Sequence, residues 1–150
     1  MQALHLKERL AEDLKAAMKA RETVRKNTVQ SVRAAILQVE KDNKVELDDA
    51  GVTDVIAKEL KKRRDVLPDY EKSGRADLIA ELKEEMNVLM AYLPAQLTRE
   101  ELEAIVRETV ESSGATSMKD MGKLMGLILP KVKGRADGKE VNELVKLYLQ

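Results

Sequence analysis

Basic side chains gather around a predicted loop near the end of this 150-residue chain, between Pro130 and Gly138. Asp137 is the one acidic residue within the loop, and we expect it to cap the helix that follows. The glycines would let the backbone approach a phosphate closely. These residue types predict an anion-binding site, and the alternative is a solvated loop whose charges only keep the chain soluble. The candidate binding residues are Lys123, Lys131, Lys133, Gly134, Arg135 and Lys139.

The charge of the whole chain gives no further sign of a nucleic-acid partner. Lys and Arg total 27, as do Asp and Glu, so the formal net charge is zero. Residues 94–118 hold two basic and five acidic side chains, whereas residues 119–150 hold seven basic and four acidic ones. A nucleic-acid site must therefore be local, and the C-terminal part is where the sequence places it.

Several kinds of catalytic and metal site are excluded by composition. The chain has no Cys, so it has no disulfide, thiol nucleophile or Cys-based zinc site. The single histidine, His5, lies in the first turn of a predicted helix, where a solvated side chain is the ordinary case. Adjacent carboxylates such as Asp48 and Asp49 diverge around a helix, and no glycine-rich phosphate fingerprint follows a strand. We therefore predict no catalytic residues, no cofactor and no metal.

The elements that position the basic residues are predicted to be helices only. Charged residues make up 36% of the chain and aromatics 2%, a mix that favours helices over strands. Asp48 and Thr98 are predicted N-caps, the latter forming a reciprocal capping box with Glu101. The apolar spacing predicts helices over about residues 3–20, 22–42, 48–73, 78–93, 98–113, 117–130 and 137–148.

This all-α fold is predicted to have two domains, with the boundary at Pro94–Leu97. Residues 1–93 would form a bundle of about four helices, and residues 94–150 a smaller domain of three helices. Pro68 predicts a kink or an early stop near Leu67, and Pro130 is predicted to end the sixth helix.

The sixth predicted helix contains two glycines on one face, Gly122 and Gly126. Each costs about 1 kcal/mol relative to alanine in a helix interior, so we expect close packing of another helix on this face. The methionines Met118, Met121 and Met125 repeat at helical spacing, which is more typical of a core than of a ligand surface. Tyr148 of the last helix is also predicted to point inward.

The N-terminus is charged and amphipathic, without the apolar centre of a signal peptide. The longest strongly apolar run, Val88–Leu93, is far too short to cross a membrane. We therefore expect a soluble cytoplasmic protein with no membrane partner.

Four blocks of the sequence resemble the GatB/YqeY family, and specifically its stand-alone YqeY-like proteins, over essentially the whole chain. The most specific block lies in the C-terminal part and contains the two glycines and the basic loop. The blocks are residues 13–20 (DLKAAMKA), 62–65 (KRRD), 92–97 (YLPAQL), and 120–126 (DMGKLMG) followed by 133–138 (KGRADG).

This resemblance implies a relation to the tail of the B subunit of tRNA-dependent amidotransferases. Those enzymes amidate Glu-tRNA(Gln) or Asp-tRNA(Asn) with ammonia from glutamine, and their tail is a helical module that engages tRNA. Amidation needs a separate, larger domain with ATP and magnesium, for which this chain has no room. A label of carbon–nitrogen ligase with glutamine as amide donor would therefore be inherited by similarity.

The resemblance and the basic loop together lead to the expectation of a non-catalytic helical protein that binds tRNA weakly through its C-terminal domain. One alternative is an accessory component of a transamidation complex, bound to an amidotransferase or another aminoacyl-tRNA-related protein. Another is a protein–protein interaction module with no RNA role, which would use the face of Gly122 and Gly126.

Overall fold

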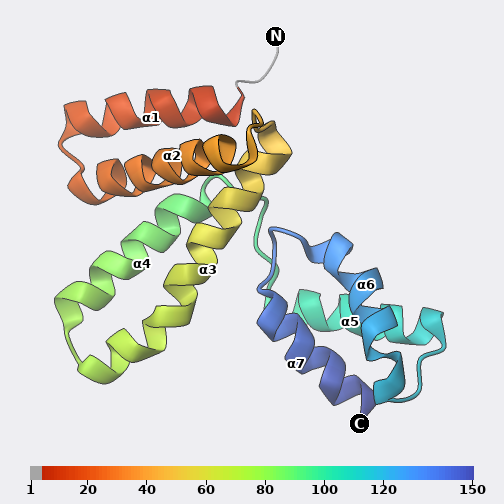
Figure 1. The fold of residues 1–150 in the computed structure, drawn as a ribbon. Helices are drawn as coiled ribbons and strands as arrows, with labels where there is room; N and C mark the ends of the chain where they lie inside the picture. The colour runs from red at the N-terminus through yellow and green to blue at the C-terminus, as the bar shows by residue number, and fades with distance from the viewer. Residues whose placement is uncertain (1–4) are drawn as a thin grey trace. The chain divides into compact units, whose positions relative to one another are not determined.

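The computed structural model describes residues 5–150, and the elements in this range are helices connected by short turns (Figure 1). The all-α fold predicted from the sequence is confirmed, and no strand occurs among the described residues. Residues 3 and 4 of the first predicted helix lie outside that range. The elements are α1 (Leu6–Ala20), α2 (Thr23–Asn43), α3 (Asp49–Ser73), α4 (Ala76–Met90), α5 (Arg99–Ser113), a short 3-10 helix η1 (Met118–Asp120), α6 (Met121–Val132) and α7 (Gly138–Leu149).

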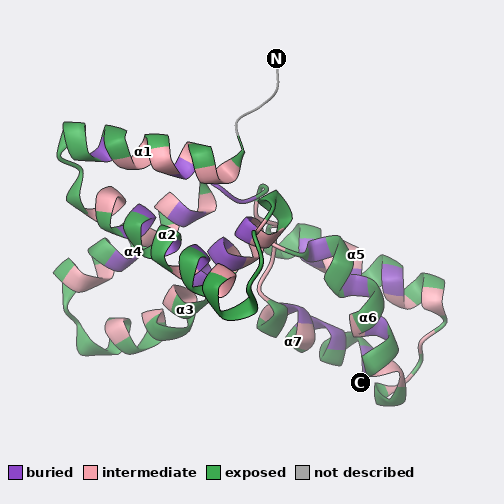
Figure 2. Cartoon of the chain, turned by 45° about the horizontal axis from the view of Figure 1, so that its top comes forward, coloured by how far each residue is buried: buried purple, intermediate pink, exposed green. Residues whose placement is uncertain are grey.

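The chain divides into two compact units, Met1–Leu93 and Pro94–Gln150. In the first unit, α2 packs against both α1 and α4, and α4 packs along α3. The buried residues follow the inner faces of these helices (Figure 2). Its core consists of Leu10, Val29, Val32, Ile36, Val52, Val55, Ile56, Leu60, Leu89, Tyr92 and Leu93.

Tyr92 connects the end of the first unit to its first two helices. Its hydroxyl donates a hydrogen bond to the carboxylate of Asp13, which also lies 3.5 Å from Arg25 of α2. The guanidinium of Arg9 lies 4.5 Å from the centre of the Tyr92 ring, and it donates a hydrogen bond of 3.1 Å to the carbonyl of Ala91. Side chains of α1 and α2 thus hold the segment after α4 in place.

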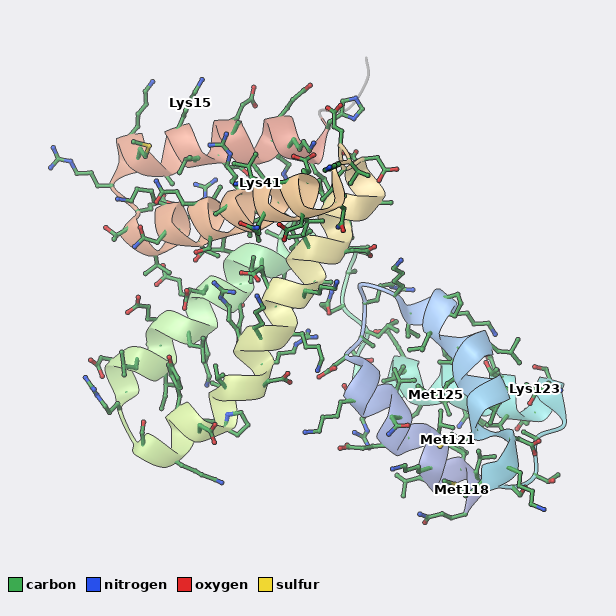
Figure 3. The ribbon with its side chains drawn as sticks, viewed as in Figure 1. Lys15, Lys41, Met118, Met121, Lys123 and Met125 are labelled. Carbon is green, nitrogen blue, oxygen red and sulfur yellow. The ribbon has the colours of Figure 1, made fainter. Side chains whose placement is uncertain are left out.

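The second unit packs α5, α6 and α7 around one apolar cluster. Met121 and Met125 lie partly buried against it, as predicted, but Met118 is 45% exposed (Figure 3). Tyr148 is also exposed, because the inward stripe of α7 continues from Val145 to Leu149. The core residues are Leu102, Val106, Leu124, Ile128, Val132, Val141, Leu144, Val145 and Leu149.

Local signals placed the helix starts correctly. The carboxylate of Asp48 accepts a hydrogen bond of 2.9 Å from the backbone N–H of Gly51, as an N-cap should. The Thr98 hydroxyl accepts from the N–H of Glu101 at 3.1 Å, and the Glu101 carboxylate accepts from the N–H of Thr98 at 3.2 Å. The predicted capping box is therefore confirmed.

The prolines do not end their helices. α3 continues through Pro68 to Ser73, so of the predicted kink or early stop near Leu67 the early stop is excluded. α6 continues through Pro130 to Val132, so the predicted stop at Pro130 is wrong. Both prolines lie at the exposed side, where water can replace the missing backbone donor. At Pro130 the carbonyl four residues earlier belongs to Gly126, which is exposed and has no side chain to cover it.

The predicted close packing on the glycine face is not found among residues 5–150. Gly122 and Gly126 are exposed, and a β-carbon at either position would meet no atom within 4 Å outside its own helix. The face is therefore open along the described residues, and the lost helix propensity is not offset by packing there.

Replacing Gly126 with alanine should consequently stabilise the fold. The added β-carbon restricts the unfolded chain and contacts nothing in the folded one, so the free energy of unfolding should rise by up to about 1 kcal/mol. Urea denaturation followed by circular dichroism measures this. Gly114→Ala is the control and should destabilise, because Gly114 ends α5 at φ 72°. A loss of stability in Gly126→Ala would show that the face is covered in solution.

Tyr92→Phe should remove about 1–2 kcal/mol from the free energy of unfolding, because a partly buried carboxylate loses its donor. Burial, together with the Asp13 carboxylate, raises the pKa of Tyr92 above its ordinary value. A raised folded-state pKa means that this contribution is present below about pH 10 and declines as the pH rises further.

Urea denaturation between about pH 9 and about pH 11 tests this sign. The wild-type chain should lose more stability over that interval than Tyr92→Phe, which has no phenol to titrate. Equal losses in the two proteins would mean that the Tyr92 hydroxyl is not held by Asp13.

Candidate nucleic-acid interface

A tight turn of residues 133–137 joins α6 to α7 and carries the centre of the predicted basic site. The backbone N–H groups of Arg135 and Ala136 both donate to the carbonyl of Val132, at 2.8 and 3.1 Å. Gly134 has φ 74°, a conformation that glycine adopts without strain. Asp137 caps α7 by accepting a hydrogen bond of 3.1 Å from the N–H of Lys139, as expected. Part of the backbone hydrogen bonding of the turn is thus made by residues of the turn and of the two helix ends beside it.

The segment just before α5 braces this turn. The side-chain amide of Gln96 donates to the carbonyl of Gly134 at 2.8 Å, and the N–H of Leu97 donates to the carbonyl of Arg135 at 2.8 Å. In return, Nε of Arg135 donates to the carbonyl of Ala95 at 3.2 Å. The turn is therefore held by three hydrogen bonds from residues about 40 positions earlier. These hydrogen bonds give the backbone of the turn a defined shape.

The predicted binding residues lie on three different elements. Lys133, Gly134 and Arg135 belong to the turn, Lys131 to the last turn of α6, and Lys139 to the first turn of α7. The predicted loop of residues 130–138 is thus shorter than expected, with a helix end on each side. Lys123 lies in the first turn of α6, about 12 Å along the helix axis from Lys131 (Figure 3). The structure brings the other four cations to one end of α6 and leaves Lys123 apart.

Lys131 has a partner that the sequence did not indicate. Its Nζ donates a hydrogen bond of 3.1 Å to the hydroxyl of Thr109, which is 2% exposed and itself donates to the carbonyl of Ile105. The sequence did contain one signal for this contact. Thr109 lies three residues after the buried Val106, so a polar side chain stands on the apolar stripe of α5 and needs a partner. The lysine head is consequently oriented, with two of its three donors left for a ligand.

Two acidic residues near this end of the unit form ion pairs with Arg99. Arg99 lies 3.4 Å from Glu140 and 3.2 Å from Glu103. At the other end of α6, the carboxylate of Asp120 accepts from the N–H groups of Thr116 and Ser117, and these hydrogen bonds lower the pKa of Asp120. The basic side chains around the turn therefore keep a local excess of positive charge.

An open hollow of about 520 Å³ lies beside the turn. Its wall is apolar apart from the side chain of Lys133. The lining residues are Leu129, Pro130, Val132, Lys133, Gly134 and Ala136.

Over residues 5–150 no group of three or more His, Cys, Asp or Glu side chains is placed to hold a metal ion. His5 lies exposed, with Nδ1 3.7 Å from a carboxylate oxygen of Asp49. Within the same range, none of the helices combines the length and apolarity needed to cross a bilayer.

Comparison with known proteins places this arrangement in a family. The model of the family described as "Yqey-like protein" matches residues 7–149. A protein of Kluyveromyces lactis named "Altered inheritance of mitochondria protein 41, mitochondrial" is 33% identical over 129 residues, covering 81% of this chain and 70% of its own. Its namesake in Pyrenophora tritici-repentis is 26% identical over 131 residues, covering 85% and 71%.

A relation to tRNA-dependent amidotransferases is also found, over a shorter stretch. The E-type subunit of the glutamyl-tRNA(Gln) amidotransferase of Thermococcus sibiricus is 45% identical over 49 residues, which is 33% of this chain and 8% of that protein. The resemblance had suggested the B-type subunit, and the similarity found here is to the E type. The link to amidotransferase subunits is therefore partial.

The predicted cytoplasmic location is contradicted by these relatives. Fungal relatives, including those of Kluyveromyces lactis and Pyrenophora tritici-repentis, are mitochondrial by name. The prediction rested on composition and on the lack of a signal-peptide pattern. These features concern secretion and membrane insertion, and they do not distinguish the cytoplasm from the mitochondrion.

The family model matches nearly the whole chain. The family model extends from α1 to the last residue of α7, so it includes both units and the basic turn. The blocks that carried the resemblance all fall within the matched range. This chain belongs to the YqeY-like protein family.

Proposed function

We propose that this chain binds tRNA, without catalysing a reaction itself, and that its C-terminal unit holds the RNA backbone. Lys131, Lys133, Arg135 and Lys139 would contact phosphates, with Lys123 as an outlying contact. The observation that carries the proposal is the braced basic turn, because it presents cations on a fixed backbone. The partial similarity to one component of an enzyme named for Glu-tRNA(Gln) supports the choice of ligand.

The mode of binding follows from the side chains available. Lys131 and Arg135 each use a donor within the protein, on Thr109 and Ala95, and keep others for a phosphate oxygen. The chain has three tyrosines and no Trp or Phe, and the basic turn contains none of them, so stacking on bases is not available there. Recognition would therefore rest on the shape and charge of a folded RNA, with weak affinity and little dependence on sequence.

A second candidate function is an accessory role in a transamidation complex. The same similarity to an amidotransferase component favours it, because such components act as parts of larger assemblies. The exposed face of Gly122 and Gly126 would then be the place for a protein partner rather than for RNA.

Replacing three cations of the turn should weaken tRNA binding without unfolding the protein. In K131Q/K133Q/R135Q, each glutamine keeps a hydrogen-bond donor but removes a charge. If three phosphate contacts are lost, the log–log slope of affinity against salt should become less steep by about 3. Fluorescence titration with tRNA at several salt concentrations measures the slope.

The control is R107Q/K119Q/K146Q, which removes the same charge from exposed positions elsewhere in the unit. It should leave the slope nearly unchanged, and circular dichroism should show both variants folded. Equal tRNA affinity and slope in K131Q/K133Q/R135Q and the wild type would refute the role of the turn.

A further inference from the structure

The largest net positive charge over a stretch of this length lies in the first unit, at residues 15–33. This stretch contains six basic side chains and one acidic one, in a protein whose formal net charge is zero. The excess is larger than that of residues 119–150, which hold seven basic and four acidic side chains. The stretch covers the second half of α1, the α1–α2 turn and the first half of α2.

Little of this charge is neutralised by the protein. Arg25 is used internally, 3.1 Å from Glu22 and 3.5 Å from Asp13. For the rest of the group, no ion pair with any residue in the range 5–150 is found. These five cations are Lys15, Lys19, Arg21, Lys26 and Arg33.

Three of these cations follow the seam between α1 and α2. Arg21 and Lys26 line one open hollow of about 350 Å³ with Met18 of α1. Lys26 and Arg33 are seven residues apart, so they share a face of α2 two turns apart. Arg33 lines the next hollow along the seam, where Lys7 of α1 forms an ion pair with Glu40 of α2.

The remaining two cations, Lys15 and Lys19, lie one turn apart on the exposed side of α1, and Lys15 projects away from α2 (Figure 3). They add to the positive potential around the turn rather than to the seam itself.

We propose that this α1–α2 surface, formed by Arg21, Lys26 and Arg33, is a second site for the phosphate backbone of a folded RNA. The inference rests on the proposed function for the class of ligand, but it uses none of the same residues. It gives the first unit a binding role that the family resemblance did not assign to particular side chains.

The composition of the surface favours RNA over a membrane. An interfacial helix needs a broad apolar face with large side chains, whereas the large apolar side chains exposed on α1 and α2 are Met18 and Leu37. The surface contains no aromatic residue, so a stacked single strand is disfavoured as well. Several cations without ion-pair partners among residues 5–150 suit regularly spaced phosphates on a structured RNA.

The test uses the full chain with R21Q/K26Q/R33Q and a matched control, K58Q/K72Q/K83Q. The control removes three exposed lysines from α3 and α4. Both variants are titrated with tRNA and with a plain RNA duplex at several salt concentrations, and their binding to phosphatidylserine vesicles is measured as well. R21Q/K26Q/R33Q should bind both RNAs roughly tenfold or more weakly at low salt, with a slope less steep by about 3, while the control stays near wild type. Circular dichroism should show both variants folded.

The outcome separates this inference from the proposed function. If R21Q/K26Q/R33Q binds as the wild type while the variant of the C-terminal turn loses affinity, the second site is overturned and the proposed function stands. If only R21Q/K26Q/R33Q loses affinity, the second site stands and the proposed role of the turn fails. An equal loss in K58Q/K72Q/K83Q would overturn the inference by showing a general charge effect. Unchanged RNA binding with lost binding to phosphatidylserine vesicles would overturn it in favour of a membrane.

Discussion

The hydrogen bonds between residues 95–97 and the turn of residues 134–135 are the constraint on which the C-terminal unit depends. Without them, the shape of a five-residue turn with a glycine at positive φ would depend on local bonds such as those to the carbonyl of Val132. With them, the backbone of the turn is fixed at both Gly134 and Arg135, and the side chain of Arg135 is held at the carbonyl of Ala95. The basic residues therefore project from a defined scaffold, which lowers the entropy cost of binding a ligand there.

The same short stretch of sequence serves each unit separately. Tyr92 belongs to the first unit, where its hydroxyl and ring meet Asp13 and Arg9 of α1. Gln96 and Leu97 belong to the second unit, where they bond to the turn. Residues 92–97 were one of the blocks that carried the family resemblance, and these contacts give a physical account of that block.

Helix starts could be predicted from sequence because capping is local. The side chains of Asp48 and Thr98 bond to backbone groups three residues away, so type and spacing were enough. The apolar repeat likewise predicted the faces of most helices. The stop at Pro130 was predicted wrongly. The free-energy cost of a proline inside a helix depends on whether water can bond to the carbonyl four residues earlier, and the exposure of that carbonyl is set by the tertiary structure.

The candidate sites were less predictable because their geometry is long-range. The partner of Lys131 lies 22 residues earlier and that of Arg135 lies 40 residues earlier, and no local pattern indicates such pairs. The face of Gly122 and Gly126 was predicted to be covered by another helix, but it is open. Helix propensity gives the free-energy cost of a glycine, and it carries no information on whether another element packs against that glycine. By contrast, the charge of residues 15–33 was readable in the sequence. Whether this charge is available to a ligand depends on the ion pairs that the six cations form, and among the described residues only Arg25 of the six forms one.

The most direct test of the central claim, that a braced basic turn binds RNA, is a two-dimensional ¹H–¹⁵N NMR titration of the full chain with tRNA. The largest chemical-shift changes should fall on the amides of residues 131–139. The amide of Leu97 should remain protected from hydrogen exchange in the free protein, because it donates to Arg135. Shifts confined to α3 and α4, or an unprotected Leu97 amide, would contradict the account.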